Sequence, residues 1–451
     1  MSEKRSSFTG KLGFVLAAAG SAVGLGNIWR FPYLAAKYGG GIFLLVYIIL
    51  SVTFGFALMC AEIAIGRKTG QSAIGAFRAI NKKYSFIGVI ASVVPAIILP
   101  YYSVIGGWVT KYFVAFVSGD AKASAQEGYF ESFIAKTGEP VLWFSIFIGL
   151  TALIVLFGVE KGIEKVSKVM MPVLIALTLF VAIYTMFMPG AMDGVAYYIT
   201  PDFSKFSVTT VLAAMGQLFY SMSLAMGIMI TYGSYMKKDV NLESSVHQIE
   251  IFDTGIAFLA GLMIIPAVFV FSGGDEAALG KGPSLMFITL PKVFESMTGG
   301  TIIGAAFFLL VFFAALTSSI SLMETVVSIV RDKTGWGRRT TCLIVLIFCI
   351  VMGLCSSFGF GIWSGFSIMG LSILDFFDFI SNSVIMPIVA LLTCIFVGYI
   401  IKPKTIEEEI EVSGRFKNKK LFGVVIKYIA PICIILILIS SVLDALGIVK
   451  I

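Results

Sequence analysis

Long apolar stretches separated by short charged segments run along the whole chain. Most of them hold about 20 residues, which is enough for an α-helix to cross roughly 30 Å of hydrocarbon. The alternation of apolar and polar residues that marks a half-buried strand is missing. Because lipid accepts only helices or closed barrels as spanning structures, the pattern predicts an all-α polytopic membrane protein. The eleven predicted spans centre near residues 12–36, 41–65, 85–117, 141–158, 169–188, 207–235, 251–271, 301–330, 340–358, 368–400 and 421–449.

The basic residues give these spans an orientation. Segments rich in Lys and Arg stay on the cytoplasmic side, so we expect a multi-pass protein of the inner or plasma membrane with a cytoplasmic N-terminus. The odd number of spans then places the C-terminus outside. The net charge of +7 follows from this topology and from attraction to anionic lipid, and not from nucleic acid. Most of the 33 lysines and arginines lie in the N-terminal segment and in segments 67–83, 159–168, 237–238, 331–339 and 402–427.

Composition excludes several other classes of protein. Hydrophobic residues make up 58% of the chain and charged residues 13%, which is more apolar surface than a soluble domain can bury. His247 is the single histidine, so we do not expect a Ser-His or His-metal enzyme site. The six cysteines lie in or beside apolar spans without metal-type spacing, which predicts neither a disulfide framework nor a metal cluster. Short connections predict one transmembrane domain over residues 1–451.

Two predicted spans contain residues that weaken a helix at membrane depth. The first holds three glycines and an asparagine in segment 20–27, followed by Arg30 and Pro32. The sixth is interrupted by small and polar residues in segment 216–227. Transporters commonly build their binding site from interrupted helices in matching positions of two inverted halves. The simpler alternative is that these small residues only let the helices pack closely.

A broken helix supplies groups that bind both signs of charge. The half that begins after the break points free N–H groups and the positive end of its dipole at the cavity, which suits a carboxylate. The half that ends at the break leaves carbonyl oxygens free, and these suit an alkali cation. A sodium ion and a substrate carboxylate can then lie side by side, each offsetting the desolvation of the other.

Polar residues inside other spans are further candidates. Asp253 lies two residues into the seventh predicted span, where a carboxylate is costly and usually functional; an ion pair near the inner surface is the alternative. The hydroxyls of segment 317–319 lie in the eighth span, where such groups commonly bond to their own helix. Glu62 closes the second span. It either accepts from N–H groups freed by a break or merely flanks the membrane.

At these positions the sequence resembles the neurotransmitter:sodium symporter family, whose members share the LeuT fold. The similarity rests on segment 20–32, the pattern GQ-x-F-Y-S-x-S-x-x-M-G at 216–227, Thr-Ser-Ser at 317–319 and Leu-Asp-Phe-Phe-Asp-Phe at 374–379. It implies a LeuT-like five-plus-five inverted repeat with helices 1 and 6 broken and an eleventh helix, as in bacterial eleven-helix transporters of hydrophobic amino acids. The two expected repeats and the extra helix cover about residues 10–190, 206–400 and 421–449.

Carried over to this sequence, the resemblance implies two sodium sites and one substrate site between the broken helices. Sodium site 1 takes Ala22, Asn27, Ser221 and Asp253. Sodium site 2 takes Gly20, Val23, Ala314, Thr317 and Ser318. The substrate-binding residues are Ala22, Leu25, Gly26, Ile98, Tyr102, Tyr220, Ser221, Ser223, Met226, Ser318 and Leu322, with Tyr102 donating to the substrate carboxylate.

The resemblance also implies two gates. Arg30 and Asp378 form the outer gate above a lid made by Tyr102 and Tyr220. The inner gate pairs Arg5 with Asp332. Phe8 stands where the family commonly has tryptophan, so we expect looser closure on the inner side.

Other departures from the family pattern concern the ligands. Asp253 stands where many members have asparagine. Its carboxylate supplies permanently the negative charge that chloride supplies in animal members, so we do not expect chloride dependence. Met226 stands where many relatives have phenylalanine, and Ala225 where many have glycine.

We therefore expect a sodium-coupled symporter that imports neutral amino acids by alternating access. The pocket candidates Leu25, Ile98, Met226 and Leu322 are apolar, which favours bulky hydrophobic or aromatic L-amino acids such as tryptophan, tyrosine, phenylalanine or leucine. Two alternatives stay open: a proton-coupled amino-acid exchanger of the same fold, and an amino-acid-binding membrane sensor without transport. The expected partners are the substrate, sodium ions and the lipid bilayer, and we expect a monomer or weak dimer.

Overall fold

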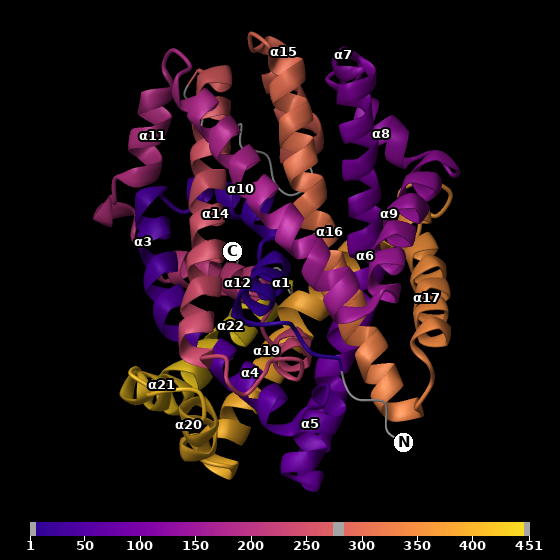
Figure 1. The fold of residues 1–451 in the computed structure, drawn as a ribbon. Helices are drawn as coiled ribbons and strands as arrows, with labels where there is room; N and C mark the ends of the chain where they lie inside the picture. The colour runs from indigo at the N-terminus through magenta and orange to yellow at the C-terminus, as the bar shows by residue number, and fades with distance from the viewer. Residues whose placement is uncertain (1–5, 274–283, 446–451) are drawn as a thin grey trace.

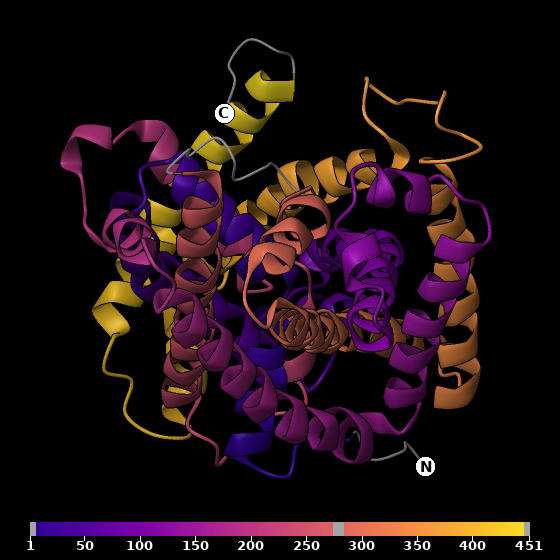
Figure 2. The same cartoon turned by 90° about the horizontal axis from the view of Figure 1, so that it is seen from above.

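The computed structural model describes residues 6–273 and 284–445, and their regular structure is helical. Most of the helices run between the two ends of one bundle (Figure 1), and seen from above they surround several helices viewed end-on (Figure 2). Within the described residues, β pairing is limited to isolated bridges of Gly40 with Pro201 and of Ile368 with Leu371. The predicted all-α fold is confirmed.

Nine helices in this part of the chain are long and apolar enough to cross a membrane, and they match nine of the eleven predicted spans. Three of them pass through a π-helical turn. These are α3 (Gly41–Leu50) with α4 (Phe56–Thr69), α18 (Ile373–Asp378) with α19 (Met386–Ile395), and α21 (Lys419–Val424) with α22 (Ala430–Ala445). The others are α6 (Ser85–Ser118), α9 (Glu139–Leu156), α10 (Lys165–Met186), α14 (Leu242–Ser272), α16 (Gly300–Thr334) and α17 (Arg338–Phe358).

The two remaining predicted spans, the first and the sixth, are the broken helices. α1 (Lys11–Ala22) is bent by 53° relative to the helical segment Gly26–Lys37, which ends in α2 (Phe31–Lys37). α12 (Val208–Ser221) is followed by α13 (Ile228–Gly233) after an interruption at residues 222–227. The prediction that helices 1 and 6 are broken is confirmed. Both lie in the middle of the bundle, where Figure 1 shows α1 beside α12.

The predicted starts of two spans are wrong. α14 begins at Leu242 and not near residue 251, and the helix of the fifth span begins at Val159 and not near residue 169. Polar and charged residues fill the first turns of both helices, so the apolar pattern marks only their later part. Asp253 therefore lies about three turns inside its helix, and not two residues from its start.

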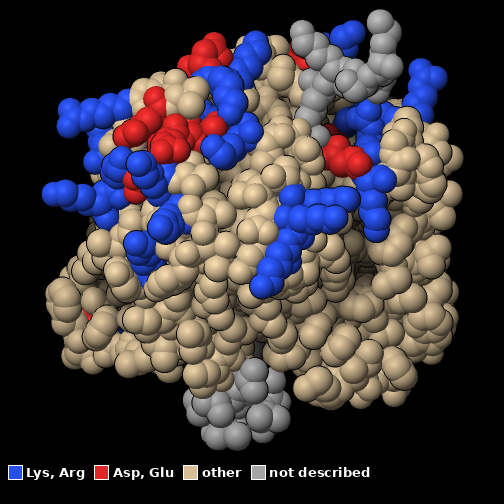
Figure 3. Space-filling view, turned by 90° about the horizontal axis from the view of Figure 1, so that it is seen from below, with Lys and Arg blue, Asp and Glu red and all other residues tan. Residues whose placement is uncertain are grey.

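Short helices cover the two ends of the bundle (Figure 1). The upper end carries α7 (Ala121–Ser124), α8 (Tyr129–Ile134), α11 (Ala191–Ile199) and α15 (Leu290–Ser296), and the lower end carries α5 (Ala73–Ile80) and α20 (Pro403–Glu411). Lysines and arginines gather on the face seen from below (Figure 3). This basic face is the one predicted to be cytoplasmic, and the orientation itself stays a prediction.

Burial separates central helices from peripheral ones. In the most apolar window, 67% of the α6 span and 61% of α16 are buried inside the protein, against 39% of α9 and 33% of the span formed by α21 and α22. Apolar side chains on the outside of a spanning helix face hydrocarbon. The span of α3 and α4 and helix α14 are also 61% buried, and the two broken helices pack among these buried helices.

Candidate functional site

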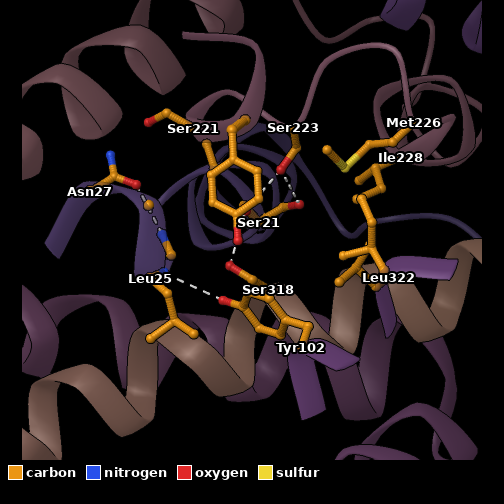
Figure 4. A pocket seen from close by; sticks show the side chains of 15 residues that line it. Ser21, Leu25, Asn27, Tyr102, Ser221, Ser223, Met226, Ile228, Ser318 and Leu322 are labelled. Carbon is orange, nitrogen blue, oxygen red and sulfur yellow. Dashed lines mark hydrogen bonds between the residues drawn. The ribbon is translucent and has the colours of Figure 1, made fainter. Parts of the chain in front are cut away.

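A cavity lies between the two breaks. Both broken helices, α6 and α16 contribute its walls (Figure 4), and it contains all eleven residues predicted for the substrate pocket. Their role in binding stays a prediction. Sequence reasoning did not assign Ser21, Gly24 and Ile228 to any site. The lining residues are Ser21, Ala22, Gly24, Leu25, Gly26, Asn27, Ile98, Tyr102, Tyr220, Ser221, Ser223, Met226, Ile228, Ser318 and Leu322.

The break after α12 is held by unusual backbone geometry. Ser223 and Ala225 have φ values of 54° and 61°, in the left-handed region that residues other than glycine rarely adopt. The freed N–H of Ala225 donates to the carboxylate of Glu62 on α4 at 2.7 Å, and the Ser223 hydroxyl donates to the Ser21 carbonyl at 2.9 Å. These bonds offset backbone strain at a functional site. Of the two alternatives for Glu62, the structure favours the one in which it accepts from a broken helix.

Glycines at the first break let side chains approach the backbone closely. A β-carbon on Gly24 would lie 2.7 Å from the Ser318 hydroxyl, and one on Gly26 would lie 2.5 Å from the ring of Tyr220. The backbone N–H of Leu25 points toward the Tyr102 hydroxyl at 3.4 Å. The second half of the helix thus presents its N-terminal end to the cavity between two tyrosines, an arrangement that suits an anion.

Two of the residues predicted for sodium site 1, Asn27 and Ser221, meet around the carboxylate of a third, Asp253, and the fourth, Ala22, lines the cavity. The amide nitrogen of Asn27 and the hydroxyl of Ser221 both donate to its Oδ1 at 2.7 Å. Tyr47 of α3 donates to its Oδ2 at 3.1 Å. All four side chains are buried. Tyr47 was missed because a tyrosine in an apolar span gives no signal until the fold places α3 against α14.

This cluster has the chemistry of a cation site. Carboxylate, amide, hydroxyl and carbonyl oxygens are the hard ligands that an alkali cation prefers. The side-chain oxygen of Asn27 accepts from the N–H of Gly24 at 3.1 Å, which holds the asparagine against the break. A sodium ion at this position would compete with that N–H for the amide oxygen, and the Asp253 carboxylate would balance the ion's charge in a buried environment.

The five residues predicted for sodium site 2 also come together. On α16, the Ser318 hydroxyl lies 3.5 Å from the carbonyl oxygen of Gly20 and 3.4 Å from that of Val23. The Thr317 hydroxyl donates to carbonyls of its own helix, those of Phe313 at 3.0 Å and Ala314 at 3.1 Å, and a β-carbon on Gly20 would lie 3.3 Å from the Thr317 side chain. Hydroxyl and carbonyl oxygens from α1 and α16 therefore converge at the point where α1 ends. Binding of sodium there stays a prediction.

The residues predicted for the outer gate contact other groups in this structure. The guanidinium of Arg30 lies over the ring of Tyr220, 5.5 Å from its centre. Asp378 accepts from the Tyr101 hydroxyl at 3.0 Å and from the amide of Asn382 at 2.6 Å. Sequence reasoning did not include Tyr101 or Asn382 in the gate. The pairing of Arg30 with Asp378 stays a prediction about the closed outer side.

On the inner side, Asp332 accepts from the backbone N–H of Ser72 at 2.8 Å. Arg5, its predicted gate partner, lies outside the described residues. Phe8 is buried, and its ring makes edge contacts with three aromatic rings, those of Phe14, Tyr232 and Tyr235. Phe8 is thus packed among aromatic rings in this structure, and the looser closure expected of the inner side stays a prediction.

Comparison with known proteins places this geometry among sodium-dependent transporters. A model of the Sodium:neurotransmitter symporter family matches residues 5–127 and 122–448. The sodium-dependent transporter YhdH of Bacillus subtilis is 35% identical over 98% of this chain and 99% of its own length. Sodium-dependent transporters of Haemophilus influenzae and Methanocaldococcus jannaschii are 30% and 32% identical over 97% and 98% of this chain, and over 98% and 91% of their own lengths.

A solved structure has the same fold. The crystal structure of MhsT in complex with L-phenylalanine superimposes with a TM-score of 0.88 at 37% sequence identity. The match covers 97% of this chain and 100% of MhsT.

Proposed function

Because this chain belongs to the Sodium:neurotransmitter symporter family and is a sodium-coupled transporter of the membrane, we propose that it imports bulky hydrophobic or aromatic L-amino acids. The observation that carries the proposal is the lining of the central cavity, none of whose residues is charged. The L-phenylalanine in the complex of MhsT supports the same substrate class. The resemblance to an amino-acid-bound transporter also favours import over an enzymatic role.

The proposed substrate lies with its carboxylate at the first break. There the N–H of Leu25 and the hydroxyl of Tyr102 face the cavity, and a helix N-terminus stabilises an anion. Sodium at site 1, beside Asn27 and Asp253, would neutralise the carboxylate from the other side. The amino group would then lie toward the carbonyl oxygens and hydroxyls of the broken helices, which accept hydrogen bonds.

The substrate side chain would occupy the apolar part of the cavity. Ile98 from α6, Met226 from the second break and Leu322 from α16 line this part, together with Ile228. A Lys, Arg, Asp or Glu side chain would find no partner of opposite charge there, at a cost of several kcal/mol. Met226 is unbranched and polarisable, so it can move aside for a large ring and contact it favourably.

Sodium supplies the driving force for accumulation. Moving one positive charge inward through 100 mV gains about 2.3 kcal/mol. Two sodium ions with a neutral zwitterion would gain about 4.6 kcal/mol, on the order of a thousandfold accumulation before the chemical gradient is counted. We propose that both predicted sodium sites are used, and that Asp253 makes transport independent of chloride.

We further propose that transport follows alternating access within one domain of two inverted repeats, over about residues 10–190 and 206–400, with the basic face in the cytoplasm. Two broken helices in matching positions support this division. Arg30 and Asp378 would close the path on the outer side after the substrate has entered. On the inner side, the predicted pair of Arg5 and Asp332 would open to release it.

Competition against sodium-dependent uptake tests the substrate class. Tryptophan, phenylalanine and leucine should displace a labelled substrate better than glycine, alanine or glutamate. Met226→Phe should change the ranking among large substrates, because it places a rigid ring where a flexible thioether stood. If glycine, alanine or glutamate competes best, or if Met226→Phe leaves the ranking untouched, the proposed substrate class is wrong.

A further inference from the structure

The segment that joins α17 to α18, residues 359–372, displays large apolar side chains on the protein surface. Ile362 is 61% exposed, Trp363 43%, Phe366 58% and Met369 64%. No charged residue occurs between Arg339 and Asp375 in the sequence. A contiguous exposed apolar surface of this kind marks a contact with a membrane or with another protein.

The backbone of this segment is ordered. The Ile368 and Leu371 residues exchange two backbone hydrogen bonds of 3.1 and 3.0 Å around Met369 and Gly370. These two central residues have φ values of 55° and 77°, as a tight two-residue hairpin requires. The fold therefore holds Met369 out at the tip of a defined turn.

The same segment is anchored to the protein from within. The ring of Phe360 packs edge-on against buried Trp108 of α6, with centroids 5.4 Å apart. The ring of Trp363 packs edge-on against Phe358, at the end of α17, at 5.5 Å. The segment is thus fixed to the bundle through these two rings, while Ile362 and Phe366 stay more than half exposed.

The location of the segment indicates what its exposed side chains contact. α17 begins in the lower half of the bundle and runs upward to end below the tops of α7 and α15 (Figure 1), so the segment after it points away from the basic face of Figure 3. Its exposed residues Leu343, Ile347 and Val351 form part of the lipid-facing surface. The segment continues this surface, and Figure 2 shows it as an orange trace that extends sideways beyond the helices. It therefore reaches outward from the bundle at the end of a helix whose outer side is apolar.

We propose that residues 359–372 are an interfacial anchor, in which Ile362, Trp363, Phe366 and Met369 insert into the headgroup–acyl boundary of the leaflet opposite the basic face. Aromatic residues, tryptophan above all, favour this layer, where an apolar ring lies in hydrocarbon and its N–H reaches water. The absence of charge along the segment and its continuity with the lipid-facing side of α17 favour lipid over a second copy of the chain. The proposal does not depend on the transported substrate.

An environment-sensitive fluorophore tests the anchor. Cys355 and Cys433, which are partly exposed, are first replaced by serine. Single cysteines are then introduced as Ile362→Cys, as Phe366→Cys and, for the control, as Glu127→Cys at an exposed position at the same end of the bundle. Each protein is labelled with the fluorophore NBD and reconstituted at one copy per nanodisc. Quenching is measured with nitroxide-bearing phospholipid and, separately, with aqueous iodide.

The labels at positions 362 and 366 should be quenched several-fold more by the lipid nitroxide than the control label, and iodide should quench them less. A label at 362 that iodide reaches as easily as the label at 127 overturns the proposal. Shielding that is present in densely loaded liposomes and lost at one copy per nanodisc also overturns it, because the segment then contacts a second copy of the chain.

Discussion

Replacing Asp253 with asparagine probes the proposed first sodium site with almost no change in shape. The carboxylate accepts from Asn27 and Ser221, each at 2.7 Å, and from Tyr47 at 3.1 Å. An amide keeps one accepting oxygen and brings an NH₂ group that cannot accept. The variant therefore removes a negative charge and leaves a buried donor, such as the Tyr47 hydroxyl, without its acceptor.

Coulomb's law sets the size of the expected effect. Opposite unit charges about 4 Å apart attract by about 4 kcal/mol at the effective dielectric constant of a protein site near 20. Since 1.4 kcal/mol corresponds to a factor of ten in affinity, the upper limit is roughly a thousandfold loss of sodium affinity. The wild-type carboxylate is itself costly to bury, which offsets part of this. We expect Asp253→Asn to weaken sodium binding by about ten- to a thousandfold.

The assay is a sodium titration of labelled amino-acid binding to purified protein. The buffer contains no chloride, and N-methylglucamine holds the ionic strength constant. Glu243→Gln is the matched control, because this buried carboxyl lies almost three turns before Asp253 on α14 and accepts from the backbone N–H groups of Lys417 and Asn418, away from the site. The control should keep wild-type sodium affinity. Chloride should restore part of the binding in Asp253→Asn and leave wild type unaffected. Unchanged sodium affinity in Asp253→Asn would refute the assignment.

Three further substitutions test the remaining site residues. Replacing Thr317 and Ser318 together with alanine should abolish sodium-driven uptake while the protein still inserts; uptake with full sodium dependence in this variant excludes site 2. Exchanging the charges of Arg30 and Asp378 should recover more transport than either single reversal, and strictly additive losses in the double-mutant cycle argue against a direct pair. Tyr47→Phe removes one hydrogen-bond donor from the Asp253 carboxylate and should change the free energy of sodium binding by about 0.5–1.5 kcal/mol. The same sodium titration measures this change. A change as large as that of Asp253→Asn would mean that Tyr47 acts in some other way.

The helical fold and the two broken helices were predictable from the sequence because lipid makes polar and glycine-rich segments informative. A glycine-rich segment such as Gly20 to Asn27 is unusual in an apolar span. A second interrupted segment at 216–227, in the corresponding span of the other half, supported the same prediction. Helix starts were less predictable. The first turns of α14 are polar, so hydropathy placed its beginning too late and Asp253 too near the end.

The site residues that the sequence did not predict were missed for a different reason. Tyr47 and Tyr101 look like ordinary aromatic residues of apolar spans, and only the packing of α3 against α14 and of α6 against α18 gives them carboxylate partners. Ile228 lies just after the second break, and its chemistry does not distinguish it from any other packing residue. Local sequence identifies costly groups, such as buried charges, more readily than the partners that satisfy them.

Uptake into proteoliposomes tests the central claim most directly. A mixture of the twenty labelled amino acids is offered outside vesicles that contain the purified protein, with an inward sodium gradient, with equal sodium on both sides, or with a proton gradient alone. The account predicts that large neutral amino acids accumulate above the external concentration only with the sodium gradient, and in the absence of chloride. Accumulation driven by the proton gradient alone, or binding without accumulation under any gradient, would contradict it.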